Sequence, residues 1–263
     1  MSKPFLAFYG HHKGCTVWCS KILIEVGQRL GLKGDYLHVP SQFNFDLQSY
    51  MERRSLDYVS YANADIQYMG GVNHRGMHVI RDPRDTVVSG YFSHKNSHPT
   101  IGWPELVPHR ERLQQMSFES GMIEEIDFSA RLPTNGRNLN SFEALASWNY
   151  RDPDILELKF EDLTTAPALH FERFFSFAGV LSEGAETGPG QIDRATLRAI
   201  LEQLDFQKLS SGRKPGEENV SSHYRKGQAG DWKDHFTPKV KDAFKRKHGP
   251  LLVQLGYESD ENW

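Results

Sequence analysis

The sequence predicts an α/β protein with a central parallel sheet flanked by helices. Three observations support this class. Short apolar runs of the kind that form buried parallel strands recur along the chain. Stretches with helical spacing of apolar residues alternate with them. The composition, 38% hydrophobic and 12% aromatic over 263 residues, is sufficient for the core of one such domain.

The first apolar run, 4–9, leads into a glycine-containing loop and then into an amphipathic helix predicted over 17–30. A strand, a tight loop and a helix in this order can bind an anion, because free backbone N–H groups at the helix N-terminus point into the loop. Lys13 adds a positive charge. The loop is not the nucleotide-triphosphatase motif, which ends in Gly-Lys followed by Ser or Thr, since here Lys13 precedes Gly14.

Four further strands are predicted over 35–39, 57–62, 77–80 and 155–160. The run 77–80 leads directly into a helix start, because Asp82 suits the N-cap and Pro83 the first helical position. The other predicted helices cover 141–151, 166–178, 193–209 and 238–255. Ligands of such sheets bind at the carboxyl ends of the strands, so the site is expected in the loops that follow them.

Two segments interrupt this alternation, and with them we predict a single domain over 1–263. The stretch 96–140 contains several prolines between short helical runs, and we interpret it as a variable insertion over the mouth of the site. The stretch 210–230 is polar, contains glycine and has few hydrophobic residues. This composition is typical of a mobile loop, and we interpret it as a lid.

Charge and cysteine content limit the possible partners. A net charge of −3 gives no overall attraction to nucleic acid or to an anionic membrane, so neither is an expected partner. No apolar run approaches the ~18 residues of a membrane helix. The N-terminus shows no signal-peptide pattern, and we expect a cytoplasmic protein without membrane insertion. Cys15 and Cys19 have neither a zinc nor a redox spacing, so free thiols are expected.

Three stretches in order resemble the sulfotransferases that use 3′-phosphoadenosine-5′-phosphosulfate (PAPS). Residues 13–18, Lys-Gly-Cys-Thr-Val-Trp, resemble that family's 5′-phosphosulfate loop, K-S-G-T-T-W. Residues 79–89 resemble its 3′-phosphate strand and helix, with the family's spacing between Arg81 and Ser89. Residues 225–233 match its R-K-G-x-x-G-D-W-K segment almost letter for letter, and residues 159–163 resemble its Y-E-D-L segment.

The resemblance implies a P-loop-like sulfotransferase domain that transfers a sulfuryl group from PAPS to a hydroxyl or amine of an acceptor, expected to be a small molecule, without a metal. PAPS carries phosphate at two ends of an adenosine, so its binding needs two anion sites, and arginine can contact a phosphate bidentately. The residues that the resemblance assigns to PAPS are Lys13, Gly14, Cys15, Thr16, Val17 and Trp18 at the 5′ end, Arg81, Ser89, Arg225, Lys226 and Gly227 at the 3′-phosphate, and Trp18, Phe160 and Phe206 beside the adenine.

Sulfuryl transfer requires a base for the acceptor and a positive charge near the leaving phosphate oxygen. We predict that Lys13 supplies the charge. The family's K-T-H-L-P histidine has no counterpart in 61–65. Other branches of the family place a glutamate near the end of the second strand, and that region here has His38. The first candidate base is therefore His38, whose ordinary pKa suits this task, and the second is Asp65. His11 and His12, beside the loop, could also contact the sulfuryl group.

Four departures from the family pattern leave alternatives open. Val17 replaces a threonine of the loop and Cys15 a glycine, and either change could weaken cofactor binding. Pro238 and Asp242 depart from the family's dimer segment, so the oligomeric state stays open. One alternative function is a nucleotide-kinase-like phosphotransferase, although the Gly-Lys-Ser/Thr ending is missing. The other is a nucleotide-binding protein of the same fold without catalysis, which the missing histidine would explain.

Overall fold

The computed structural model describes residues 4–131, 139–184 and 186–263, and the predicted α/β class is confirmed. All the strand pairs of the sheet are parallel, and the strand order is β2-β3-β1-β4-β5. The strands are β1 (Phe5–Tyr9), β2 (Gly34–Leu37), β3 (Tyr58–Tyr61), β4 (His74–Ile80) and β5 (Ile155–Lys159). The chain moves from one side of β1 to the other between β3 and β4. The loop after β1 therefore lies at the switch point where ligands of such sheets bind.

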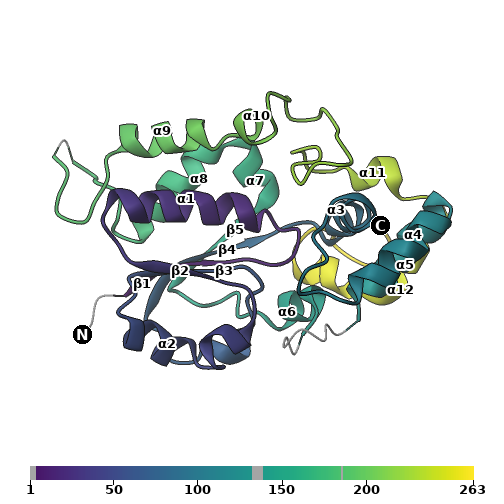
Figure 1. Cartoon of the computed structure of the whole chain (residues 1–263), viewed down its shortest axis with the longest axis horizontal. Helices are drawn as coiled ribbons and strands as arrows, with labels where there is room; N and C mark the ends of the chain where they lie inside the picture. Colours follow the sequence, from purple (N-terminus) through teal and green to yellow (C-terminus); the bar gives the residue numbers. More distant parts are fainter. Residues whose placement is uncertain (1–3, 132–138, 185) are drawn as a thin grey trace.

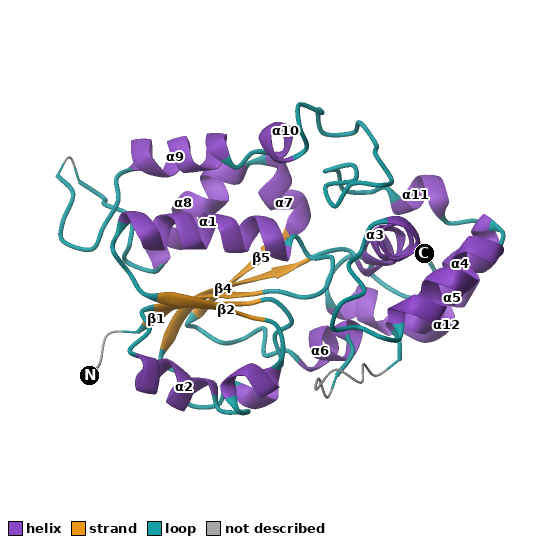
Figure 2. Ribbon diagram, viewed as in Figure 1, coloured by secondary structure: helices purple, strands orange, loops and turns teal. Residues whose placement is uncertain are grey.

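Helices cover both faces of the sheet, as Figures 1 and 2 show. On one face lie α1 (Thr16–Arg29), α7 (Phe160–Thr165), α8 (Pro167–Phe177), α9 (Arg194–Gln203) and α10 (Phe206–Leu209). The opposite face carries α2 (Leu47–Arg54), with the 3₁₀ turns η1 (Pro40–Phe43) and η2 (Ile66–Tyr68) nearby in the chain. A group of helices packs beside the sheet: α3 (Pro83–Asn96), α4 (Leu106–Gln115), α5 (Phe118–Ser129), α6 (Ser141–Ser147), α11 (Trp232–His235) and α12 (Pro238–Gln254).

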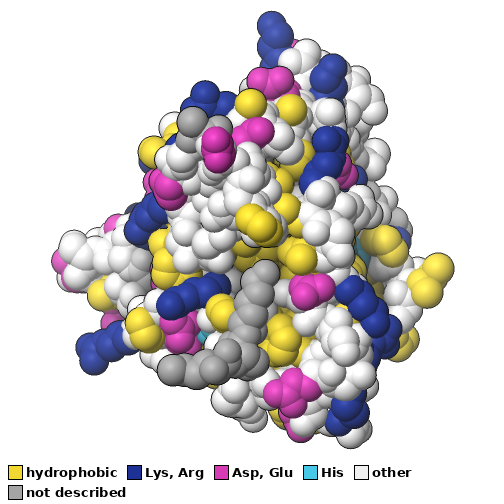
Figure 3. All heavy atoms as spheres, turned by 90° about the vertical axis from the view of Figure 1, so that its left-hand side faces the viewer, with side chains coloured by type: hydrophobic (Ala, Val, Ile, Leu, Met, Phe, Trp, Pro, Cys, Tyr) yellow, Lys and Arg dark blue, Asp and Glu magenta, His cyan; other side chains and the backbone are white. Residues whose placement is uncertain are grey.

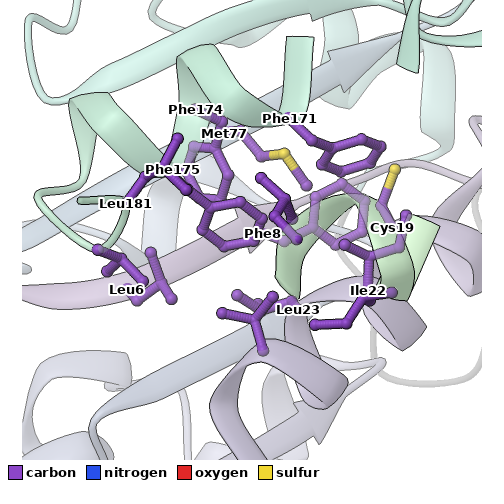
Figure 4. Close-up of a cluster of buried hydrophobic side chains, with 14 of the residues drawn as sticks. Leu6, Phe8, Cys19, Ile22, Leu23, Met77, Phe171, Phe174, Phe175 and Leu181 are labelled. Atoms are coloured by element: carbon purple, nitrogen blue, oxygen red, sulfur yellow. The ribbon is translucent and has the colours of Figure 1, made fainter. Parts of the chain in front are cut away.

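The core that holds the loop after β1 in place lies between α1, the sheet and α8 (Figure 4). In α1 the buried residues Cys19, Ile22, Leu23 and Val26 recur at helical spacing and form one apolar face. This face packs against strand residues and against three phenylalanines of α8, which are Phe171, Phe174 and Phe175. The start of α1 is thereby fixed relative to the ends of the strands.

Several element boundaries differ from the predicted ones. The predicted helix 193–209 is two helices, because Asp205 accepts a hydrogen bond from the Lys208 N–H and caps a separate α10. β2 ends at Leu37, so that His38 follows the strand, and β4 begins at His74. Helix α2 was not predicted, although Asp46 caps it. The segment 96–140 forms α4 and α5, and its residues 132–138 lie outside the described part of the chain, as do residues 1–3.

The distribution of charged side chains on the surface and the state of the two cysteines can be compared with the sequence expectations. Figure 3 shows Lys and Arg side chains interspersed with Asp and Glu, so this face has no extended region of a single charge. Cys15 and Cys19 are free thiols with their Sγ atoms 3.5 Å apart. Within the described ranges, no helix combines the length and the apolar character needed to cross a membrane.

Candidate active site

The loop between β1 and α1 makes a sharp turn through two non-glycine residues with left-handed backbone, Lys13 (φ 64°) and Cys15 (φ 55°). Between them, the Gly14 N–H donates to the His11 carbonyl oxygen at 2.9 Å. A Cβ on Gly14 would lie 3.1 Å from that same oxygen, so a side chain would crowd this turn. Cys15 occupies the N-cap position of α1 and provides no side-chain cap. The first N–H groups of α1 are therefore available to an anion in the loop.

Two cations lie beside this loop. Burial, followed by the charge of Arg81, lowers the pKa of Lys13 to about 7. Arg81 follows the end of β4, donates from Nη1 to the Lys13 carbonyl oxygen at 3.2 Å, and lies 4.3 Å from the centre of the Phe160 ring. Its buried Nε has no hydrogen-bond partner among the described residues. A buried donor of this kind costs free energy unless a ligand accepts its hydrogen bond, so this site fits an anion.

The segment 210–230 brings a second pair of cations to the same place. Arg225 is buried and forms ion pairs with Glu218 and Asp231, and Lys226 also pairs with Asp231. The Nε of Arg225 is likewise buried and without a partner in the described structure. Gly227 has φ 63°, and a Cβ there would lie 2.3 Å from the Phe206 ring. Glycine at this position lets the backbone contact the face of the ring.

The end of the segment 210–230 is attached to the body of the protein by hydrogen bonds from its backbone to a side chain of α3. The Asp85 carboxylate, near the start of α3, accepts from the Gly230 N–H at 2.6 Å and from the Trp232 N–H at 2.8 Å. The Arg84 guanidinium lies 3.8 Å from the centre of the Trp232 ring. Arg213 donates to the Arg225 carbonyl oxygen at 2.7 Å and to two other backbone oxygens of the segment. These contacts hold the segment against the start of α3, and its role as a lid stays a prediction.

A cavity of about 960 Å³ is lined by all four of these cations, Lys13, Arg81, Arg225 and Lys226. Every PAPS-binding residue predicted from the sequence lines it except Gly14, whose part is the backbone turn: Lys13, Cys15, Thr16, Val17, Trp18, Arg81, Ser89, Phe160, Phe206, Arg225, Lys226 and Gly227. Trp18 is fixed in the wall because its Nε1 donates to the Leu204 carbonyl oxygen at 2.8 Å. The fold thus brings together residues that are more than 200 positions apart in the chain.

The two candidate bases lie in different places. His38 lines the cavity, and its ring contacts the Tyr36 ring edge-on, with 4.5 Å between the ring centres. Asp65 is buried and caps η2, where its carboxylate accepts from the Gln67 N–H at 3.0 Å. Burial raises the pKa of Asp65. The structure therefore brings His38, and not Asp65, to the cavity.

Sequence reasoning missed a set of histidines that the fold assembles around the loop. The Nε2 of His11 lies 2.8 Å from the Nε2 of His78, whose Nδ1 lies 2.6 Å from Glu157. His12 makes the equivalent contact, 3.0 Å, with the Nε2 of His94. The tandem histidines beside the loop were noted in the sequence. Their partners could not be found there, because 67 and 82 residues separate the two pairs.

A parallel α/β sheet with a strand, a tight loop and a helix at its switch point, and with four cations on one cavity there, is typical of a nucleotide-binding protein of the P-loop-like type. The model of the sulfotransferase domain matches residues 70–256, which is most of the chain. The chain therefore belongs to the sulfotransferase domain family.

Relatives and solved structures agree with this family. The chain is 37% identical over 93 residues to a flavonol sulfotransferase-like protein of Flaveria bidentis, a match that covers 34% of this chain and 30% of that protein. It is 25% identical over 261 residues to mouse sulfotransferase 2A6, covering 92% and 81% of the two chains. The chain thus spans about a third of the plant relative and most of the mouse protein.

Two solved structures share the fold. Mouse sulfotransferase SULT7A1 complexed with PAP has a TM-score of 0.66 at 14% identity, covering 98% of this chain and 88% of that one. Retinol dehydratase in complex with androsterone and the inactive cofactor PAP has a TM-score of 0.54 at 16% identity, covering 96% and 82%. The predicted single sheet with flanking helices is therefore the fold of sulfotransferases.

Proposed function

We propose that this protein transfers a sulfuryl group from PAPS to a hydroxyl or amine of a small-molecule acceptor. The observation that carries this proposal is one cavity lined by the loop with Lys13 and by two buried arginines, Arg81 and Arg225, whose Nε atoms lack a partner among the described residues. A ligand with phosphate at both ends of a nucleoside can contact the loop with Lys13 through one phosphate and the two arginines through the other. Family membership and PAP-bound structures of the same fold support the same donor.

In this proposal PAPS supplies an activated sulfuryl group, and the chain binds and orients it. The loop N–H groups and Lys13 hold the 5′ end, while Arg81, Ser89 and the segment 225–227 hold the 3′-phosphate. Trp18, Phe160 and Phe206 border the adenine, and the contact of Phe160 with Arg81 keeps that guanidinium in place. Lys13 then faces the phosphate oxygen on which negative charge develops during transfer.

The remaining cavity wall favours a small acceptor with an apolar body. Ile101 and Trp103, from the segment after α3, line the cavity together with Pro99. Apolar walls with a few polar groups are typical of small-molecule sites. Androsterone occupies one structure of the same fold, which fits this class of acceptor. We propose His38 as the base, because it lines this cavity whereas Asp65 does not.

We also propose a cytoplasmic location, because plant relatives of this chain are named cytosolic sulfotransferases.

Ligand-induced stabilisation tests the proposal against its alternatives. We expect adenosine 3′,5′-bisphosphate, without added metal, to raise Tm, and ATP with Mg²⁺ not to. Incubation with labelled PAPS and a panel of phenols, alcohols and amines should then give labelled product. The reverse pattern of stabilisation would point to a phosphotransferase. Stabilisation by the bisphosphate without transfer to any acceptor would leave a nucleotide-binding protein without catalysis.

We expect Arg81→Ala to weaken binding of adenosine 3′,5′-bisphosphate by about 1.5–3 kcal/mol, because charge-assisted hydrogen bonds to one phosphate are lost. Isothermal titration calorimetry measures this change. Arg75→Ala is the matched control, because Arg75 lies on β4, the strand that Arg81 follows, is partly exposed and pairs with Asp154 away from the cavity. Equal affinities for wild type and Arg81→Ala would contradict the assignment of Arg81 to the 3′-phosphate.

A further inference from the structure

Three histidines from two separate segments meet beside the phosphate-binding loop. They are His12 of the loop, His94 in the last turn of α3 and His98 just after that helix. One ring nitrogen of each lies within 4.8 Å of one ring nitrogen of the other two. The closest printed pair is the Nε2 of His12 and the Nε2 of His94, at 3.0 Å. The three rings also contact the Trp103 ring edge-on.

A buried carboxylate orients the central ring of this cluster. Glu125 of α5 is fully buried and lies 2.9 Å from the Nδ1 of His94 and 2.8 Å from the Nε2 of His109. A His94 that donates from Nδ1 to this carboxylate presents the lone pair of Nε2 to His12 and His98. A carboxylate behind a histidine in this way is the usual support of a metal-binding imidazole.

The packing around Glu125 is specific to this carboxylate. A Cβ on Gly90 would lie 2.5 Å from the Glu125 Oε1, so glycine at this position of α3 gives the carboxylate its space. Ser129 donates to the same oxygen at 3.2 Å. The oxygens of Glu125 are thus held between two histidines and a hydroxyl, and the side chain cannot turn away from His94 without leaving these donors buried and unpaired.

The cluster lies between two cavities. His12 and His98 line the main cavity, together with Lys13, whereas His94 and Glu125 line a second cavity of about 270 Å³ that His12 also reaches. A group bound by the three histidines therefore has one side open to the main cavity, close to the position of the transferred sulfuryl group in the proposed function.

The second histidine pair provides a contrast within the same protein. His11, His78 and Glu157 repeat the arrangement of two imidazoles and one carboxylate. Among the described residues, however, His11 and His78 belong to no group of three potential ligands, whereas His12 and His94 form such a group with His98. A hydrogen bond between two imidazoles accounts for the contact of His11 with His78. In the other arrangement, His98 adds a third imidazole beside the hydrogen-bonded His12 and His94.

We propose that His12, His94 and His98 bind one divalent transition-metal ion, with Zn²⁺ as the representative, and that its remaining coordination position faces the main cavity. Zn–N distances of about 2.0–2.1 Å in a tetrahedral site place ligand nitrogens ~3.3 Å apart, close to the His12–His94 distance. His98 is only partly buried, so its ring can adjust. Three neutral imidazoles with one open position are the ligand set of a catalytic zinc site.

Some charged groups near the three histidines oppose the binding of a cation, and one favours it. Arg110, whose Nε donates to the His94 carbonyl oxygen at 2.7 Å, and Lys13 oppose a bound cation, and Glu125 favours it. The metal proposal does not depend on the transfer reaction. If the proposed function holds, the open position could lower the pKa of an acceptor hydroxyl, which would assist the proposed base His38 and not replace it.

Metal titration tests the site directly. The full chain is treated with a chelator, desalted and titrated with Zn²⁺ by calorimetry, and with Co²⁺ by visible absorption. We expect one ion per chain and the strong visible bands of four-coordinate Co²⁺. His98→Ala and His12→Ala should each weaken Zn²⁺ binding at least tenfold, and Glu125→Gln by 10–100-fold through the orientation of His94. His38→Ala, which removes a histidine from another part of the same cavity wall, should bind Zn²⁺ as wild type does.

Two results would overturn the proposal: no Zn²⁺ binding by the chelator-treated wild type, or the same affinity in wild type, His12→Ala and His98→Ala. The second would place the ion elsewhere, and Cys15→Ser would test the adjacent thiols. Circular dichroism and thermal unfolding of each variant confirm that it is folded. Binding of adenosine 3′,5′-bisphosphate, measured on the same metal-free samples, separates failure of this site from failure of the proposed function.

Discussion

Replacing Lys13 by alanine is expected to lower kcat for sulfuryl transfer by ~10²–10³-fold, with a much smaller change in the Kd of adenosine 3′,5′-bisphosphate. The bisphosphate lacks the sulfuryl group, so its binding does not report the charge that develops on the bridging oxygen. Interactions that strengthen in the transition state lower the barrier, and those equal in both states do not. Lys13 lies where that charge forms in the proposed function.

The structure supports this separation of binding from turnover. The backbone of Lys13 is held by its left-handed turn and by the hydrogen bond from Arg81 to its carbonyl oxygen, so truncating the side chain leaves the loop in place. Lys33→Ala is the control, because this exposed lysine bonds the Arg54 carbonyl oxygen far from the cavity. Single-turnover kinetics and calorimetry measure the two effects. Equal losses in kcat and in bisphosphate affinity would show that Lys13 contributes to nucleotide binding and not specifically to the transition state.

The sequence predicted those parts of the site that are set by local chemistry. The loop with Lys13 follows a buried strand and Arg81 follows another, and in a parallel sheet both must emerge at the same edge. Helix starts were also readable, because Asp82 and Pro83 are local signals. The break between α9 and α10 was missed even though Asp205 is such a signal, since the apolar spacing continues through it.

Side-chain partners from distant segments could not be read from the sequence. His12 and His94 are 82 residues apart, and nothing in either local pattern indicates the other. Asp65 is a candidate base because it lies in 61–65, where the resemblance places the family's histidine, but its neighbours make it the cap of the 3₁₀ turn η2. The resemblance of 225–233 to the family segment rests on residue identities alone. These do not indicate that Asp231 pairs with Arg225 and Lys226, the two cations assigned to the 3′-phosphate.

This pairing makes Asp231→Ala the variant with the largest expected effect on stability. The Asp231 side chain is fully buried and forms ion pairs with Arg225 and Lys226. Burial alone would raise its pKa, yet hydrogen bonds from His235, Lys226 and Arg225 hold it well below its usual range. The ionised carboxylate therefore stabilises the fold above pH ~4, and this contribution is lost only as the pH falls through the lowered pKa.

Removing Asp231 leaves the buried Arg225 without its main partner. We expect the free energy of unfolding to fall by about 3–5 kcal/mol at neutral pH, measured by denaturant titration. Asp234→Ala should cost far less, because the Asp234 carboxylate is exposed and lies 3.8 Å from Lys226. A loss no larger than that of Asp234→Ala would show that the Asp231 ion pairs contribute little to the fold.

The same variant also reports where the 3′-phosphate binds. In the proposed site a phosphate contacts Arg225 and Lys226, so it can replace part of the negative charge that Asp231→Ala removes. Saturating adenosine 3′,5′-bisphosphate should therefore raise Tm more in Asp231→Ala than in wild type, relative to each protein without ligand. Asp234→Ala should show the wild-type increase. If the increase in Asp231→Ala is equal to or smaller than that of wild type, the phosphate does not reach Arg225 and Lys226, and the assignment of the segment 225–227 to the nucleotide is wrong.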